Sequence, residues 1–166
     1  MITIGADHRG FLLKEYLKNE LQKLGYTVND VGTFNNNQVD YNDYANKVCY
    51  DVINNNNTKG ILICGSGIGM SIAANRHKNI RCANITSANR NVVKLARQHN
   101  DINVISFGAS IHNEMNEMNK MNKINEINEI NTITNEQALD IVKLFLSTEF
   151  INNENYIRRN NKLNKI

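Results

Sequence analysis

The chain has 166 residues, three cysteines and a formal net charge of +3 at pH 7. This length suits one domain with one hydrophobic core, so we expect a single domain over residues 1–166. The lysines and arginines are scattered along the chain, which gives no sign of a nucleic-acid-binding surface. Cys49, Cys64 and Cys82 form no CxxC pair and no even disulfide set, which favours a reducing compartment.

The apolar segments are shorter than the roughly 20 residues that a membrane-spanning helix needs. The first predicted strand begins at Ile2 and a polar loop follows at Asp7, so the start of the chain does not resemble a secretory leader. We therefore expect a cytoplasmic protein whose partners include neither nucleic acid nor a membrane.

Hydrophobic periodicity divides the chain into alternating strands and helices. Short apolar runs rich in isoleucine and valine indicate strands, and apolar residues three or four positions apart indicate amphipathic helices. Strands are expected over residues 2–6, 26–31, 61–64, 80–85 and 102–107, and helices over residues 11–24, 44–53, 88–98 and 136–148, with an alanine-rich helix after residue 69.

This alternation, with its short connections, predicts a doubly wound α/β fold: a Rossmann-like three-layer sandwich with a five-stranded parallel sheet. Ligands of such sheets bind at the carboxyl ends of the strands. We expect three groups there: Asp7 with His8, Cys64 with the glycines that follow it, and His99 with Asn100 just before the fifth strand.

Residues 112–135 break the alternation. They repeat asparagine every three residues with methionine or isoleucine before it, a period that fits neither a strand nor an amphipathic helix. We interpret this stretch as a low-complexity surface insertion without a direct chemical role. After the last predicted helix the chain continues as a polar tail that contains Arg158 and Arg159.

The stretch after the third strand is the strongest sign of a functional site. Cys64 is followed by Gly65, Gly67 and Gly69, which let the backbone turn sharply and let a ligand approach bare amides. With a helix start beyond them, these amides can bind an anion. The spacing differs from the dinucleotide fingerprint G-x-G-x-x-G and lacks the P-loop ending, so a small phosphate or a developing oxyanion suits it better. Cys64 is either a reactive base or nucleophile, or a buried inert thiol.

Several motifs occur in order along the chain: Gly-Ala-Asp7-His8-Arg-Gly-Phe, Asp40-Tyr41, Cys64-Gly-Ser-Gly-Ile-Gly-Met-Ser-Ile-Ala-Ala-Asn75, Ile-Arg81-Cys, Arg97-Gln-His99-Asn100-Asp-Ile-Asn103-Val and Phe-Gly-Ala. Together they resemble the ribose-5-phosphate isomerase B family, which includes the galactose-6-phosphate isomerases. The resemblance runs from residue 2 to about 110 and resumes at about 136–158.

The resemblance implies an aldose–ketose isomerase that interconverts ribose 5-phosphate and ribulose 5-phosphate through an enediolate, without a metal or another cofactor. Such a reaction needs a base, an oxyanion stabiliser and a group that opens the sugar ring. By resemblance Cys64 is the base and His99 the ring-opening acid/base, whereas a lone histidine before a strand would otherwise be structural. The amides of residues 65–69, with Ile68 among them, and the Ser66 hydroxyl would hold the oxyanion; a simple tight turn would also need these glycines.

Other residues receive substrate-binding roles from the same resemblance. Asp7 would orient the sugar or cap the following helix, and His8 would lie towards the phosphate. Tyr41 would form an aromatic wall or fill the core, and Asn100 would orient sugar hydroxyls. Members of the family are dimers or larger oligomers, so the resemblance implies a homodimer or homotetramer whose sites take His99 and a tail arginine from the partner subunit.

The expected phosphate-binding residues depart from the family pattern. Ser110 stands where the family commonly has an arginine, Asn152-Asn153-Glu154-Asn155 replaces a Gly-Gly-Arg-His segment, and only Arg158 aligns with a later arginine. Two lost charge-assisted contacts of ~1.5–3 kcal/mol each would weaken phosphosugar binding about 100-fold or more. Arg9, beside the proposed site, or Arg159 would compensate. A six-carbon phosphosugar isomerase and a non-catalytic sugar-binding relative therefore stay open as alternatives.

Overall fold

The computed structural model describes residues 1–109 and 133–165. Its strands are β1 (Ile2–Ala6), β2 (Val28–Asp30), β3 (Lys59–Cys64), β4 (Cys82–Ile85) and β5 (Val104–Gly108). Its helices are α1 (Phe11–Lys23), α2 (Tyr41–Asn54), α3 (Ile68–Ala74), α4 (Arg90–Asn100), α6 (Asn135–Ser147) and α7 (Glu154–Leu163).

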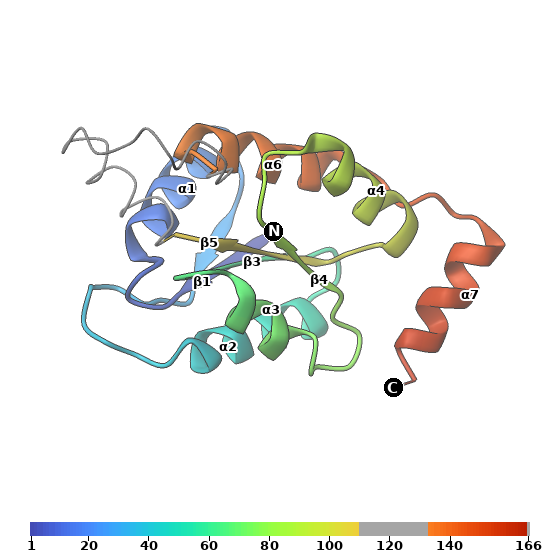
Figure 1. Ribbon diagram of the computed structural model, residues 1–166, viewed down its shortest axis with the longest axis horizontal. Coiled ribbons are helices and arrows are strands. Elements are labelled where there is room, and N and C mark those ends of the chain that lie inside the picture. Colours follow the sequence, from blue (N-terminus) through green and yellow to red (C-terminus); the bar gives the residue numbers. More distant parts are fainter. Residues whose placement is uncertain (110–132, 166) are drawn as a thin grey trace, which may run out of the picture.

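The five strands form one parallel sheet in the order β2-β1-β3-β5-β4. Figure 1 shows this sheet between two helical layers, with α1, α4 and α6 on one face and α2 and α3 on the other. Helix α7 stands beside the sandwich, next to α4. The structure confirms the predicted doubly wound α/β fold.

The central strands are buried on both faces, and their side chains alternate between two hydrophobic cores. In β3, Ile61 and Ile63 pack in the core beneath α1 and α6, whereas Leu62 and Cys64 pack in the core above α2 and α3. Successive side chains of a strand point to opposite faces, so burial on both sides requires a continuous apolar run. That requirement explains the apolar sequence that predicted this strand.

The tail after α6 differs from the prediction, because it contains helix α7. The Asn153 side chain accepts a hydrogen bond from the Asn155 N–H and caps the start of this helix. Asparagine has a modest helix propensity but is a preferred cap, so an asparagine-rich segment is easily mistaken for a loop.

The predicted insertion over residues 112–135 is too long at its carboxyl end. Ile133 is buried in the core, and the Thr134 hydroxyl accepts a hydrogen bond from the Gln137 N–H in a capping box that starts α6. The remainder of the predicted insertion, and Ser110, lie outside the described residues. Within the described ranges, no helix has both the length and the apolar character needed to cross a membrane.

A buried ion-pair network ties α1 to the end of β2. The Lys14 Nζ, fully buried, lies 2.6 Å from Glu15 Oε1 and 2.5 Å from Asp30 Oδ2. The Lys18 Nζ contacts the same two carboxylates at 2.6 and 3.1 Å. Burial raises the pKa of Asp30, but hydrogen bonds from Lys14 and from the Gly32 N–H outweigh it and hold this pKa below its ordinary value. Two cations and two carboxylates therefore compensate one another where single charges would be costly.

Asp30→Asn is expected to lower the free energy of unfolding by about 3–5 kcal/mol at neutral pH, because it removes one of two counter-charges from buried Lys14. Folding lowers the pKa of Asp30. The stability that ionised Asp30 contributes is therefore present above the unfolded-state pKa of this carboxyl and is lost as the pH falls through the folded-state pKa. Urea unfolding along a pH series should show the difference between wild type and variant shrink in acid. Glu20→Gln, which breaks the exposed pair with Lys23, is the control and should change stability little. A difference that does not vary with pH would contradict this account.

Candidate active site

The carboxyl edge of the sheet brings together the loops that follow β1, β3 and β5. Ala6 pairs with Ile63 and Cys64 pairs with Gly108, so Asp7 lies beside Cys64. The Asp7 N–H donates to the Ile63 carbonyl at 3.0 Å. A Cβ atom at Gly10 would lie only 2.5 Å from the same carbonyl oxygen, so the loop after β1 packs directly on the end of β3.

Cys64 closes β3 as a buried residue whose sulfur turns into the glycine loop. The Gly67 N–H donates to the Cys64 Sγ at 3.2 Å, and the Ile68 N–H donates to the Ser66 Oγ at 3.3 Å. The Cys64 carbonyl accepts a hydrogen bond from the Ala109 N–H at 2.8 Å. The thiol and the loop amides thus lie side by side at the end of β3, and the bond to Ala109 ties this end to the end of β5.

Gly67 has the conformation that closes this loop. Its φ of 76° is left-handed, and a Cβ atom there would lie 2.3 Å from Asn84 Oδ1 and 2.8 Å from the Phe107 carbonyl carbon. The Ser106 hydroxyl donates to the same Asn84 oxygen at 3.1 Å, which fixes that neighbour. The loop can therefore lie against β4 and β5 only with glycine at this position.

Tyr41, the first residue of α2, forms one side of the loop. A Cβ atom at Gly69 would lie 2.9 Å from the Tyr41 Cζ, so the phenol ring packs against the bare backbone of Gly69. Tyr41 is 38% exposed, which rules out the alternative of a core tyrosine. Its position is that of a wall beside the loop.

Asp7 and His8 follow β1 with separate hydrogen bonds. The Asp7 Oδ1 accepts from the N–H groups of Arg9 and Gly10, both at 2.9 Å, and so closes the turn before α1. The N-cap of α1 is Gly10, so Asp7 does not cap the helix itself. The His8 Nδ1 accepts a hydrogen bond from the Val39 N–H at 3.3 Å, and Arg9 beside it is exposed. Among the described residues, none donates to the Asp7 Oδ2.

His99 and Asn100 lie at the opposite edge of the sheet, which corrects the expectation that they share the carboxyl edge. They end α4, which carries the chain back to the start of β5. Val104 at that start pairs with Gly60, four residues before Cys64, a separation of about 13 Å along the strand. A helix that joins two parallel strands must return to their amino ends, so its last turn cannot lie beside Cys64 of the same chain.

Helix α7 accompanies His99 at this second edge. The rings of His99 and Tyr156 are stacked, with centroids 4.4 Å apart and planes 24° from parallel. Arg158 is exposed, and its Nη2 donates to the Asn155 Oδ1 at 3.2 Å. Sequence reasoning missed Tyr156 because it expected no helix here. The signal that could have found it is Asn153 followed by Glu154, a cap residue before an acidic first turn.

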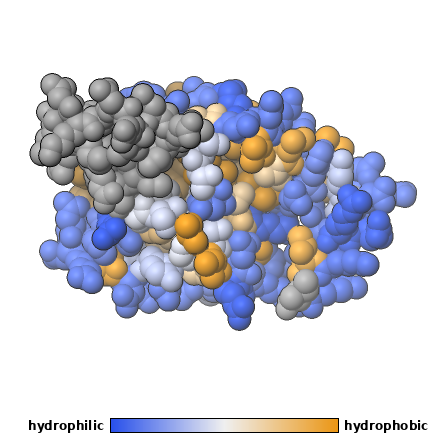
Figure 2. Space-filling model, viewed as in Figure 1, coloured by the Kyte–Doolittle hydropathy of each residue, from blue (hydrophilic) through white to orange (hydrophobic). Residues whose placement is uncertain are grey.

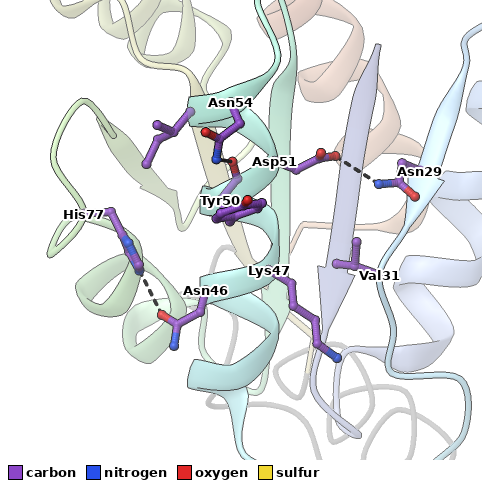
Figure 3. A pocket seen from close by; sticks show the side chains of 9 residues that line it. Asn29, Val31, Asn46, Lys47, Tyr50, Asp51, Asn54 and His77 are labelled. Carbon is purple, nitrogen blue, oxygen red and sulfur yellow. Dashed lines mark hydrogen bonds between the residues drawn. The ribbon is translucent and has the colours of Figure 1, made fainter.

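A separate hollow of about 680 Å³ lies on the outer side of α2 (Figure 3). None of the predicted site residues lines it. Its labelled side chains lie on both sides of the helix, with His77 on one side, Asn29 on the other and Tyr50 between them. Tyr50 is 71% exposed, so the hollow is an open depression and not a closed ligand site. The Cys64 loop is therefore the candidate site.

The described residues contain no group of three histidine, cysteine or acidic side chains that could hold a metal ion. The groups that the described residues bring to the carboxyl edge include the Cys64 thiol, the Asp7 carboxylate, the His8 imidazole and the amides of a glycine loop. A thiol beside amide donors and a carboxylate can move a proton next to a carbonyl group and hold the oxyanion that results.

Comparison with known proteins identifies the family. The model of the family described as Ribose/Galactose Isomerase matches residues 2–166. This chain belongs to the ribose/galactose isomerase family. It is 36% identical over 160 residues to a putative sugar phosphate isomerase of Rickettsia bellii, covering 95% of this chain and 93% of that protein. It is 42% identical over 113 residues to ribose-5-phosphate isomerase B of Escherichia coli, covering 66% and 72% of the two chains.

Solved structures of ribose-5-phosphate isomerases share the fold of this family member along its length. The enzyme from Thermotoga maritima superposes with a TM-score of 0.82 at 37% identity and covers 99% of this chain and 97% of its own. Ribose-5-phosphate isomerase B from Mycoplasma genitalium, solved with bound ribulose 5-phosphate, gives a TM-score of 0.78 at 28% identity, with 99% and 94% covered.

Gly67→Ala is expected to destabilise the protein by about 2–5 kcal/mol, the sum of left-handed strain and overlap with the Phe107 backbone. Gly25→Ala is the matched control, because Gly25 also has a left-handed φ, 86°, but a Cβ atom there meets nothing within 4 Å. The control should lose only the strain, about 1–2 kcal/mol. Chemical denaturation of both variants measures the two losses in the free energy of unfolding, and their difference is the cost of the overlap with β5. Equal losses would show that the loop is not packed against β5 as described.

Proposed function

We propose that this chain is a cytoplasmic ribose-5-phosphate isomerase that interconverts ribose 5-phosphate and ribulose 5-phosphate. One observation carries the proposal: Cys64 is buried at the end of a strand beside Asp7, and its sulfur accepts a hydrogen bond from the Gly67 N–H. The names of the relatives in Escherichia coli and Thermotoga maritima, and the ribulose 5-phosphate bound to the Mycoplasma genitalium enzyme, support the same substrate.

In the proposed reaction Cys64, as the thiolate, removes the proton from C2 of the open-chain aldose. The electron pair left on C2 forms the double bond of an enediolate, and negative charge moves to O1. The amides of residues 65–69 and the Ser66 hydroxyl stabilise that charge. A hydroxyl proton passes from O2 to O1, and the thiol returns its proton to C1 to give the ketose. Asp7, through its Oδ2, orients the sugar hydroxyls.

Ring opening requires a second acid/base group, and we assign it to His99 of the partner subunit, with Asn100 beside it. Within one chain His99 and Cys64 lie at opposite edges of the sheet. In a homodimer, alone or within a homotetramer, a two-fold axis would place the carboxyl edge of each subunit beside the His99 edge of its partner. The cleft between subunits would then hold the substrate.

Exposed apolar side chains support this assembly. Ile68 and Ile72 on α3 are 55% and 61% exposed, and Val92 and Leu95 on α4 are 54% and 49% exposed. Figure 2 shows hydrophobic side chains gathered over α3 and over α4, on the face of the molecule seen in Figure 1. Apolar patches on a water-facing surface mark interaction sites, and a second copy of this chain is the partner we propose.

The phosphate end of the substrate is assigned to Arg9 and to α7 of the partner. Arg9 is exposed beside His8 at the carboxyl edge. Arg159 follows Tyr156 by three residues, so it lies on the side of α7 that packs towards His99, and Arg158 lies one position around the helix. Because Glu154 and Asn155 stand where the family has arginine and histidine, a six-carbon phosphosugar remains the second candidate substrate.

Cys64→Ala is expected to reduce kcat for ribose 5-phosphate by at least about 100-fold, the usual contribution of a positioned base. A coupled assay for ribulose 5-phosphate measures it, with galactose 6-phosphate and free ribose as competing substrates. No turnover by wild type on ribose 5-phosphate would refute the proposed function. Unchanged turnover by the variant would remove Cys64 as the base.

Subunit complementation tests the shared site. Cys64→Ala and His99→Asn, each of which is expected to retain little activity alone, are unfolded together and refolded at equal concentration. Half of the dimers are then mixed, and each mixed dimer has one site of two with both residues, so about one quarter of wild-type activity should return. If every site uses Cys64 and His99 of a single chain, the mixture stays inactive.

Tyr156→Ala is expected to lower kcat several-fold, because the stacked ring that holds His99 is lost, whereas Tyr156→Phe keeps the ring and should retain activity. Aromatic pairs contribute about 0.5–1.5 kcal/mol beyond burial, which sets the size of the effect. Steady-state kinetics on both variants measures it. Equal activity of the two variants would show that the stack does not position His99.

A further inference from the structure

His8 receives a hydrogen bond that determines the position of its ring proton. The Val39 N–H lies 3.3 Å from the His8 Nδ1. A backbone N–H can only donate, so Nδ1 must be the unprotonated nitrogen of the ring. In a neutral imidazole the proton is then on Nε2. The two residues are 31 positions apart, so this contact depends on the fold and not on local sequence.

The segment that carries Val39 is fixed at both ends. At its start the Thr33 N–H donates to the Ala6 carbonyl at 2.8 Å, and the Ala6 N–H donates to the Gly32 carbonyl at 2.7 Å. At its end Tyr41 packs against Gly69 of the Cys64 loop. Residues 33–40 therefore span the carboxyl edge of the sheet from β2 to α2 and present a backbone amide to His8.

Asp30 connects this segment to the buried ion pairs. Its Oδ1 accepts from the Gly32 N–H at 3.0 Å, while its Oδ2 lies 2.5 Å from the Lys14 Nζ. The Phe34 ring lies 5.5 Å from the same ammonium group. The network that stabilises α1 thus also holds the first residues of the segment in place.

We propose that the Val39 amide locks His8 as the Nε2–H tautomer, so that His8 serves as a hydrogen-bond donor to an anionic oxygen of the substrate and not as a proton acceptor. Val39 is a positioning residue that acts through its backbone. The neighbouring Asp7 carboxylate accepts from the N–H groups of Arg9 and Gly10, and among the described residues it makes no hydrogen bond with the His8 ring. This inference rests on the proposed function for the identity of the anion, which would be the phosphate of the sugar.

The tautomer is measured directly by ¹⁵N NMR of the histidine rings in the ligand-free wild type, with His8 assigned from its absence in His8→Gln. Wild type is expected to show a protonated Nε2 and an unprotonated Nδ1. Val39→Ala, which keeps the N–H, should give the same spectrum, and Val39→Pro, which lacks it, should give a mixture of tautomers. A wild type with the proton on Nδ1, or a Val39→Pro spectrum equal to that of wild type, would overturn the proposal. This measurement does not depend on isomerase activity.

The donor role of His8 is tested by two substitutions whose side chains differ in length. Asparagine places its oxygen near the position of Nδ1 and has nothing at Nε2, whereas glutamine places its amide nitrogen near Nε2 and can still donate. His8→Asn is therefore expected to raise KM for the phosphosugar, and the dissociation constant of inorganic phosphate, at least about 10-fold more than His8→Gln, with similar kcat in both variants. Equal KM values, or a loss confined to kcat, would show that His8 does not act as this donor.

Discussion

The parallel register of β1, β3 and β5 is the constraint on which the candidate site depends. Because Ala6 pairs with Ile63 and Cys64 with Gly108, the three strands end at one level, and the loops that follow them meet at one edge of the sheet. The same geometry sends the end of every connecting helix to the opposite edge. A chain of this topology therefore presents Cys64 and His99 on separate surfaces, and the proposed reaction needs both.

Steric fit at the glycines explains how the loops meet so closely. Gly10 lies on the Ile63 carbonyl, Gly67 on the end of β5 and Gly69 on the Tyr41 ring, and a methyl group at any of these positions would overlap a neighbour. The glycine pattern thus has two physical causes. It exposes amides to a ligand, and it allows three backbone segments to pack without side chains between them.

The sequence was sufficient for the fold and for the loop, because both leave local signals. Continuous apolar runs indicated buried parallel strands, and Cys64 with its alternating glycines indicated the tight loop after β3. Helix α7 and the contact between His8 and Val39 left weaker signals or none, since asparagine favours caps over helix interiors and since a contact across 31 residues has no local pattern. The burial of Lys14 could have been predicted from the sequence, because Lys14 shares a helical face with Leu17 and Leu21.

The two ends of the proposed substrate are held by parts of the molecule with different constraints. The loop of Cys64 packs through Gly67 on the end of β5 and through Gly69 on the Tyr41 ring, so a substitution at either glycine changes the fold as well as the chemistry. Helix α7 stands beside the sandwich, and its arginines are exposed. Substitutions on α7 alter charge at little cost in stability, since exposed side chains contribute little to the core. Glu154 and Asn155 can therefore depart from the family pattern while the reaction centre stays intact, and affinity for the phosphate can change independently of proton transfer.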